Sequence, residues 1–437
     1  MKTVHILGAG ADVPFGVPLA DGLLGALNDF TQGDGASLGK ILRRKLGRFQ
    51  FGFEKYASDQ GEGFAERVLH DPKLTADLGA ALSKIPDDDE GLLGAVREML
   101  SRLDQIREAN MLNAETSATF AGAAGEGEEM ADESLLRLRG ITLSPMPRNA
   151  MVTVFRNACS TPGLVGDERD AIQRVVSLMT NFEDLLTELF AGFYTGHASN
   201  QRKYLYVSWL LWAFMRMRSF EPHVTRAKHS SFYDRLDNLS NDDSLITFNY
   251  TRFDSCPPDR VVRFHGDCTG YIRYDRGELM TTDSIATNIA SIDDIERFVE
   301  GLDIDISAGR IFMPAIIPPA TLKPVLNSHF VKLWSDAAEV LNDADLLVGV
   351  GFSFNPVDRH FNDLFRKAAG QKRTAILNPD LDGTTAAICA LLGQDPQALS
   401  SIEFQGHSAR RSDQLLIVAV PSEEVSAALL DTIRSGW

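Results

Sequence analysis

The chain has 437 residues, of which 44% are hydrophobic and 24% charged, and its formal net charge is −17. This composition is typical of a globular protein with enough length for two or three domains. The negative charge argues against direct nucleic-acid binding, because there is no net positive field to displace counterions from phosphates.

Secretion and membrane insertion are both disfavoured. The chain begins with strand-like sequence, not with the basic segment and long apolar run of a signal peptide. Its longest apolar run, Tyr204–Met215, is too short to span a bilayer and predicts a buried helix. The four cysteines form no C-x-x-C pair, so neither a disulfide framework nor a metal site is expected. We therefore expect a cytoplasmic protein.

The first eighteen residues are the most informative segment. Thr3–Leu7 is short, apolar and partly β-branched, which predicts a strand covered on both faces. Gly8 and Gly10 follow directly, and a helix is expected at about Leu19–Leu27. A glycine turn between a strand and a helix is typical of a site that binds the phosphates of a nucleotide.

This turn does not fit a dehydrogenase. The position of a third glycine holds Val13, and Gly16-Val17-Pro18 follows. No second strand ends in Asp or Glu where the ribose of the cofactor would be held. A tight turn without any ligand remains an equally good interpretation of the two glycines alone.

The middle of the chain is predicted to be helical. Gly91–Arg107, Asp170–Thr180 and Asn181–Phe193 each carry apolar residues at helical spacing. Asn113–Glu133 is rich in Ala, Gly and Glu and predicts a surface loop. Residues 81–240 are therefore expected to form a large all-helical insertion or cap domain.

The last part of the chain alternates strands and helices. The predicted strands are Ser244–Phe248, Arg260–Phe264, Arg310–Ile317, Asp345–Val350, Arg373–Leu377 and Gln414–Val420, with an amphipathic helix at His329–Asn342. This alternation predicts an α/β fold: a Rossmann-like parallel sheet with helices on both faces, which the opening strand joins. Residues 1–80 and 241–437 would form this domain.

Ligands of such sheets bind beyond the carboxyl ends of the strands, so the residues that follow each strand are the candidates for a site. His265 follows one strand and is able to act as a base near neutral pH. Asn249 follows the preceding strand. Asparagine at such a position often only makes a turn, but with His265 it forms a polar pair at neighbouring strand ends. His360 is favoured as a plain helix position.

Five motifs together resemble the SIR2-like domains of bacterial anti-phage defence, a sirtuin-like family, more than the protein-deacylating sirtuins. In chain order they are GAGADVPFGVP, TFNYTRFD, RFHGD, VGVGFSFNPVD and LNPD. In the helical middle only Asn181–Leu189 is similar.

The resemblance implies that NAD is the substrate and assigns its contacts. It implies that Asn249 positions the attacking nucleophile beside the nicotinamide ribose and that His265 is the general base. The NAD-binding residues that it implies are Gly8, Ala9, Gly10, Asp12, Gly16, Pro18, Thr247, Gly351, Ser353 and Asn378. Two positions depart from the family pattern. Asp12 replaces a serine, and Thr251 stands where an acidic residue is common, with Asp254 further on.

The implied reaction is hydrolysis of NAD to nicotinamide and ADP-ribose, which would deplete NAD during abortive infection. An NAD-dependent deacylase and a non-catalytic sensor of NAD or ADP-ribose, or an assembly subunit, are the alternatives. The familiar deacylases carry a zinc ribbon with paired C-x-x-C motifs, and this chain has none. A homo-oligomer and a separate regulatory partner, such as an ATPase or a nucleotide-sensing protein, are expected. Tyr204–Met215 and Gly91–Arg107 are candidate assembly surfaces, although core packing is favoured for both.

Overall fold

A computed structural model describes residues 1–19, 22–53, 55–56, 76, 79–80, 182–219, 232–233, 242–251, 258–281, 291–320, 323 and 327–437. The chain divides into two units, one of residues 1–20, 30–50 and 183–437, the other of residues 21–29 and 51–182. All of the strands in the part of the chain that the structure describes, and the candidate site, lie in the first unit. The predicted helices Gly91–Arg107 and Asp170–Thr180 and the predicted loop Asn113–Glu133 lie outside the described residues.

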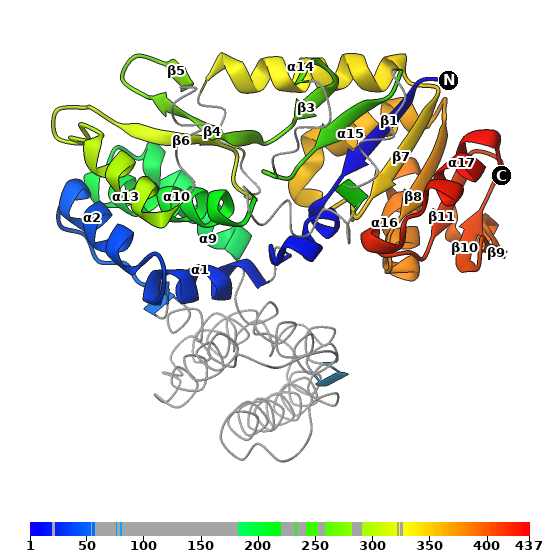
Figure 1. The fold of residues 1–437 in the computed structure, drawn as a ribbon, viewed down its shortest axis with the longest axis horizontal. Coiled ribbons are helices and arrows are strands. Elements are labelled where there is room, and N and C mark those ends of the chain that lie inside the picture. Colours follow the sequence, from blue (N-terminus) through cyan, green and yellow to red (C-terminus); the bar gives the residue numbers. More distant parts are fainter. Residues whose placement is uncertain are drawn as a thin grey trace, which may run out of the picture. The chain divides into compact units, whose positions relative to one another are not determined.

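The main sheet of the described chain has eight strands in the order β3-β2-β1-β7-β8-β11-β10-β9 (Figure 1). Its strands are β1 (Thr3–Leu7), β2 (Ser244–Thr247), β3 (Val261–Arg263), β7 (Leu346–Val350), β8 (Arg373–Leu377), β9 (Ser400–Phe404), β10 (His407–Arg411) and β11 (Leu415–Val418). The six strands from β3 to β11 are parallel, and β10 and β9 are added antiparallel at one edge. The protein therefore has an α/β fold with a mixed sheet.

The opening strand lies inside this sheet, as predicted. β1 pairs with β2 on one side and with β7 on the other, so that segments far apart in the chain meet. Every residue of β1 and of β7 is buried. Their continuous apolar sequences are those of strands covered on both faces.

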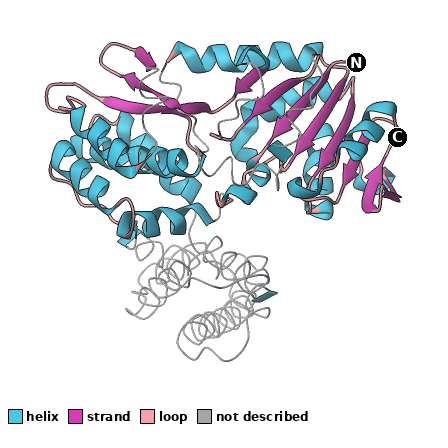
Figure 2. Ribbon diagram, in the orientation of Figure 1, coloured by secondary structure: helices cyan, strands magenta, loops and turns pink. Residues whose placement is uncertain are grey.

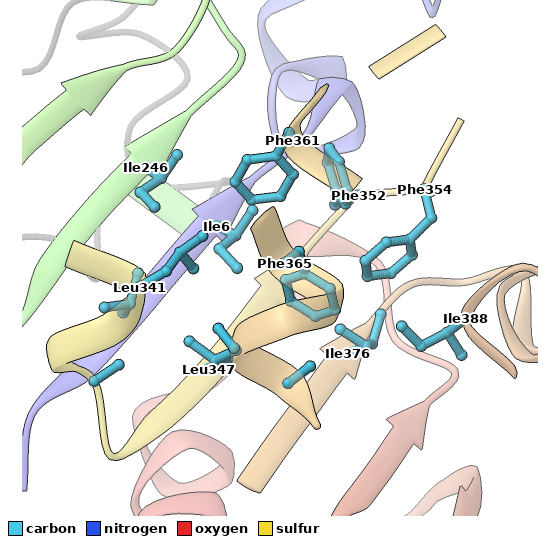
Figure 3. Packing of buried hydrophobic residues seen from close by; sticks show 14 of the residues in the cluster. Ile6, Ile246, Leu341, Leu347, Phe352, Phe354, Phe361, Phe365, Ile376 and Ile388 are labelled. Atoms are coloured by element: carbon cyan, nitrogen blue, oxygen red, sulfur yellow. The ribbon is translucent and has the colours of Figure 1, made fainter. Parts of the chain in front are cut away.

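Helices cover both faces of the sheet (Figure 2). On one face, α14 (Ser328–Asp343), α15 (Arg359–Ala369) and α16 (Leu381–Leu392) pack on the inward residues of β1, β7 and β8. Figure 3 shows this core, in which Phe361 and Phe365 of α15 lie over Ile6 and Ile376. On the other face lies α17 (Ala427–Ser435), whose Arg434 forms an ion pair with Asp243. Both charges act on the buried ring of His5.

A second layer consists of helices on a small antiparallel sheet, with the strand order β5-β4-β6. Its elements are α2 (Ala36–Leu46), α9 (Phe182–Tyr194), α10 (Ala198–Ser219), β4 (Gly266–Arg273), β5 (Glu278–Thr281), α13 (Ile292–Gly301) and β6 (Phe312–Ile316). The indole of Trp209 in α10 donates to the oxygen of Phe312 at 3.0 Å, and Arg44 of α2 pairs with Glu300 of α13. Tyr204–Met215 is buried in α10, so the prediction of a core helix is confirmed and this stretch is not a free assembly surface.

The location of one predicted strand was wrong. Arg310–Ile317 contains β6, which pairs antiparallel with β4 and not with the parallel sheet. β4 itself was not predicted, because GDCTGYIR alternates between buried and partly exposed residues without an apolar run. The helices α9 and α10, which fall within the predicted helical part 81–240, belong to the same unit as the sheet. The rest of that part lies largely outside the described residues, so the domain division stays a prediction.

The first α-helix, α1 (Leu23–Gln32), begins after Leu19, where a helix was expected to start. Two 3-10 turns, Ala9–Ala11 and Val13–Phe15, stand between β1 and this helix. Of the described helices, none is both long and apolar enough to cross a membrane.

Candidate functional site

The glycine turn after β1 packs directly against the turn after β7. The amide of Gly8 donates to Val350 O and that of Gly10 to Gly351 O, both at 3.0 Å. A Cβ on Gly8 would lie 2.4 Å from Gly351 O, and one on Gly10 would lie 2.8 Å from Gly351 Cα. These glycines are therefore required by the close approach of two backbone segments, whether or not a ligand binds.

The same turn has few amides left for an anion. Ala11 donates to Gly8 O and Asp12 to Ala9 O, both at 3.0 Å, so these amides are used within the turn. Gly16 has a φ of +72°, a backbone conformation that glycine adopts without strain, and it precedes Pro18. The predicted helix does follow the turn as α1, but the 3-10 turns Ala9–Ala11 and Val13–Phe15 come before it, so its first amides do not directly follow Gly8 and Gly10.

Asn249 is buried and bound to this turn. It lies two residues beyond the end of β2, and its main-chain amide donates to the hydroxyl of Thr247 at 3.1 Å. Its side-chain Nδ2 donates to Gly8 O at 2.8 Å and to the hydroxyl of Tyr233 at 3.3 Å. These bonds fix the orientation of the amide, and Oδ1 accepts no hydrogen bond from a described residue.

Asp12 is a buried carboxylate held by two hydroxyl groups. Tyr233 donates to its Oδ1 and Thr251 to its Oδ2. Burial raises the pKa of Asp12 to about 6, although the hydrogen bonds from Thr251, Tyr233 and Asn249 act in the opposite direction. Asp12, which was predicted to contact NAD, thus has both oxygens engaged by the protein.

His265 lies beyond the end of β3 and belongs to a group of three ionisable side chains. Its Nε2 is 3.0 Å from Oδ1 of Asp358, and Nζ of Lys323 donates to the same oxygen at 2.8 Å. Burial lowers the pKa of His265, as does the positive charge of Lys323, while Asp358 opposes both. Burial would raise the pKa of Asp358, but His265 and Lys323 together outweigh it and hold this pKa below its ordinary value.

Asn249 and His265 follow the ends of two neighbouring strands of the sheet. Thr247 in β2 pairs with Arg263 in β3, so each of the two residues lies two positions beyond a matched pair of parallel strands. The ring of Phe248, the residue before Asn249, contacts the His265 imidazole edge to face, with 5.0 Å between the ring centroids. This adjacency was the main expectation from the sequence about the site.

The ends of β7 and β8 lie beside the glycine turn but make mostly structural bonds. Gly351 donates to Leu377 O at 2.9 Å, and Ser353 is exposed. Asn378 donates through Nδ2 to Phe352 O at 3.4 Å and accepts from the amide of Asp380 at 3.0 Å. His360 is exposed in α15, and its ring contacts that of Trp334. These features fit an ordinary helix position, as predicted.

Reasoning from the sequence missed three residues of this site. Asp358 is the last residue of the motif VGVGFSFNPVD, yet no role was given to it. Lys323 follows β6, whose end is beside the site because the amide of Ile317 donates to His265 O at 2.8 Å. Tyr233 could not be identified as a site residue from the sequence, because it lies in a stretch that was predicted to be helical and far from any strand end. The position of Asp254 lies outside the described residues.

Comparisons with known proteins add no assignment. No family model matches the chain, and no curated protein matches it. Within the described residues, no group of three or more His, Cys, Asp or Glu side chains is placed to hold a metal ion. The site therefore has to be interpreted from its own chemistry.

Proposed function

We propose that the protein is an NAD hydrolase that cleaves NAD to nicotinamide and ADP-ribose, with Asn249 and His265 as its catalytic residues. The observation that carries this proposal is the position of these two residues, each two places beyond the paired ends of adjacent parallel strands. Each side chain is fixed by the protein at one end: Asn249 through Nδ2 and His265 through Nε2. The opposite atoms, Asn249 Oδ1 and His265 Nδ1, accept no hydrogen bond from described residues.

The sheet supports a dinucleotide as the ligand. The parallel strands β3-β2-β1-β7-β8-β11 have the order of a Rossmann-like sheet, whose ligands bind where that order reverses. Here the reversal lies between β1 and β7, where Gly8 and Gly10 meet Gly351. We extend the proposal to a Rossmann-like domain that is interrupted by an all-helical insertion.

The chemistry needs a placed nucleophile and one base. The bond between nicotinamide and C1′ of the ribose breaks, and the neutral nicotinamide leaves. A water oxygen bonds to C1′, and its proton passes to His265 Nδ1. Asn249 Oδ1 accepts a hydrogen bond from the other O–H of this water and so orients it. A base placed in this way contributes about 10²-fold to 10⁴-fold in rate.

The experiment is a turnover assay with purified protein and NAD, without any acyl peptide, in which nicotinamide and ADP-ribose are measured by chromatography. His265→Ala and Asn249→Ala abolish turnover. The matched controls His360→Ala and Asn342→Ala, both at exposed helix positions, leave it unchanged. Product formed only with an acetylated peptide would show a deacylase instead. Tight NAD binding without turnover, with or without a partner protein, would show a sensor.

A cytoplasmic enzyme that destroys NAD has to be kept inactive, so we propose regulation by self-assembly or by a separate sensor protein, such as an ATPase. Gly91–Arg107, the remaining candidate assembly surface, lies outside the described residues. Turnover is to be compared with and without a co-purified partner. Light scattering that shows only monomer at every concentration would contradict self-assembly.

A further inference from the structure

Three ionisable side chains from separate segments meet beside the site. His265 follows β3, Lys323 follows β6, and Asp358 ends the 3-10 turn Pro356–Asp358 that leads into α15. Oδ1 of Asp358 receives both other groups, at 3.0 Å from His265 Nε2 and 2.8 Å from Lys323 Nζ. The Lys323 side chain is only 1% exposed and that of Asp358 15%, so water screens this cluster weakly.

The geometry defines the tautomer of the imidazole. A carboxylate oxygen accepts hydrogen bonds only, so the ring nitrogen that faces it has to carry a proton. That nitrogen is Nε2. In a neutral ring the second nitrogen, Nδ1, then keeps its lone pair and is free to accept a proton. The other tautomer would set two lone pairs against each other at 3.0 Å.

Lys323 stabilises the ionised form of Asp358, on which this tautomer depends. Burial disfavours the charged form of a lone carboxyl group and so favours its protonation. A protonated carboxyl group would no longer hold the ring proton of a neighbouring imidazole on one nitrogen. The ammonium group of Lys323 is bound to the same oxygen as the ring and favours the ionised carboxylate. Its Nζ lies 3.5 Å from His265 Nε2, so its charge also acts on the imidazole.

We propose that Asp358 and Lys323 are positioning residues that act through His265: Asp358 holds the ring proton on Nε2, and Lys323 keeps Asp358 ionised, so that Nδ1 is the basic atom. This inference deepens the proposed function and rests on it for the role of Nδ1. The state of the ring itself does not depend on NAD, and it is tested separately.

The first experiment is nitrogen NMR of the full chain labelled with ¹⁵N-histidine, without NAD. The signals of His265 are those that disappear in His265→Gln. We expect the wild-type ring to carry its proton on Nε2, and Asp358→Asn to give a mixture of tautomers. A wild-type proton on Nδ1, or a ring unchanged by Asp358→Asn, would overturn the proposal. Lys332 and Asp336 form an exposed pair in α14, so Asp336→Asn is the matched control and changes nothing.

The second experiment is the pH profile of kcat/KM, whose fall at acidic pH reports protonation of the base. Lys323→Met removes a positive charge from beside the ring, so this fall moves to higher pH. Asp358→Asn removes a negative charge, so the fall moves to lower pH and the plateau drops by roughly 10-fold or more. Lys323→Arg keeps the charge and the wild-type profile, and the control Lys332→Met has no effect. Shifts in the same direction for both variants would contradict the proposal.

Thermal unfolding of each variant shows whether it still folds. Asp358→Asn combined with Lys323→Met removes both charges together and leaves no unpaired buried ion. This folded double variant is expected to lose the single tautomer, and retention of it would overturn the proposal. A fixed Nε2–H ring in a protein without NAD turnover would refute only the proposed function. Turnover that needs His265 but ignores Asp358 and Lys323 would refute only this inference.

Discussion

The side-chain amide of Asn249 donates to the main-chain oxygen of Gly8 at 2.8 Å, although the two residues are 241 positions apart in the chain. Through this bond the end of β2 holds the turn after β1, and that turn in turn rests on Gly351. A change in the packing of the turn is therefore transmitted to the amide of Asn249.

Gly10→Ala is expected to destabilise the protein and reduce NAD turnover. The new methyl group would lie 2.8 Å from Gly351 Cα, so one of the two backbone segments has to shift, and such overpacking costs about 1–3 kcal/mol. Denaturant unfolding measures this. The control is Gly301→Ala in α13, where an added Cβ meets nothing within 4 Å. Equal stability of the two variants would contradict the packing argument.

Asp12→Asn is expected to reduce the pH dependence of the free energy of unfolding between pH 4 and 6. The pKa of Asp12 is about 6 in the folded protein and 3.8 in the unfolded chain, so the folded state binds more protons in this range. The wild type therefore loses stability as the pH rises, by up to about 3 kcal/mol for a fully buried group. Unfolding in denaturant at pH 4, 5, 6 and 7 measures the difference between the two proteins. A constant difference would show that Asp12 does not titrate there.

Tyr233→Phe is expected to slow NAD turnover more than it weakens NAD binding. The hydroxyl of Tyr233 donates to Asp12 and accepts from Asn249, so its loss removes one of the two bonds that hold the amide and leaves the carboxylate short of a donor. The missing donor costs about 1–3 kcal/mol of stability. Tyr194→Phe is the control, because Tyr194 is 56% exposed. An unchanged kcat in Tyr233→Phe would argue that Asn249 needs no support.

Arg434→Met is expected to destabilise the protein by roughly 3 kcal/mol, because it removes a cation from the buried carboxylate of Asp243 at 2.5 Å. Adding Asp243→Asn should recover part of this loss in the double variant. The exposed pair of Arg410 and Asp382 is the comparison, and Arg410→Met should cost less than about 1 kcal/mol. Similar losses in both single variants would show that burial does not matter here.

The sequence was sufficient to predict the parallel strands and the polar pair at their ends. Apolar runs such as Leu346–Val350 are strong signals, since a strand buried on both faces carries no polar alternation. Asn249 and His265 could be assigned to neighbouring strand ends because the ends of neighbouring parallel strands share one edge of the sheet.

The partners of these residues could not be predicted. Asp358 and Lys323 reach His265 from turns whose course depends on tertiary packing, and no local pattern encodes that course. The pairing of β6 with β4 was missed for a related reason, because an apolar run does not tell which strand it will pair with. Asp12 was expected to face the ligand, and only the three-dimensional arrangement brings Tyr233 and Thr251 onto its oxygens.

The position of β1 between β2 and β7 has a consequence for folding. β1 pairs with two strands that lie far from it in the chain, and the hydroxyl of Ser422 donates to Gly10 O across 412 positions. Contacts of such long separation close large loops, so we expect the glycine turn to reach its final geometry late in folding. If this turn holds NAD for cleavage, partly folded chains do not cleave it.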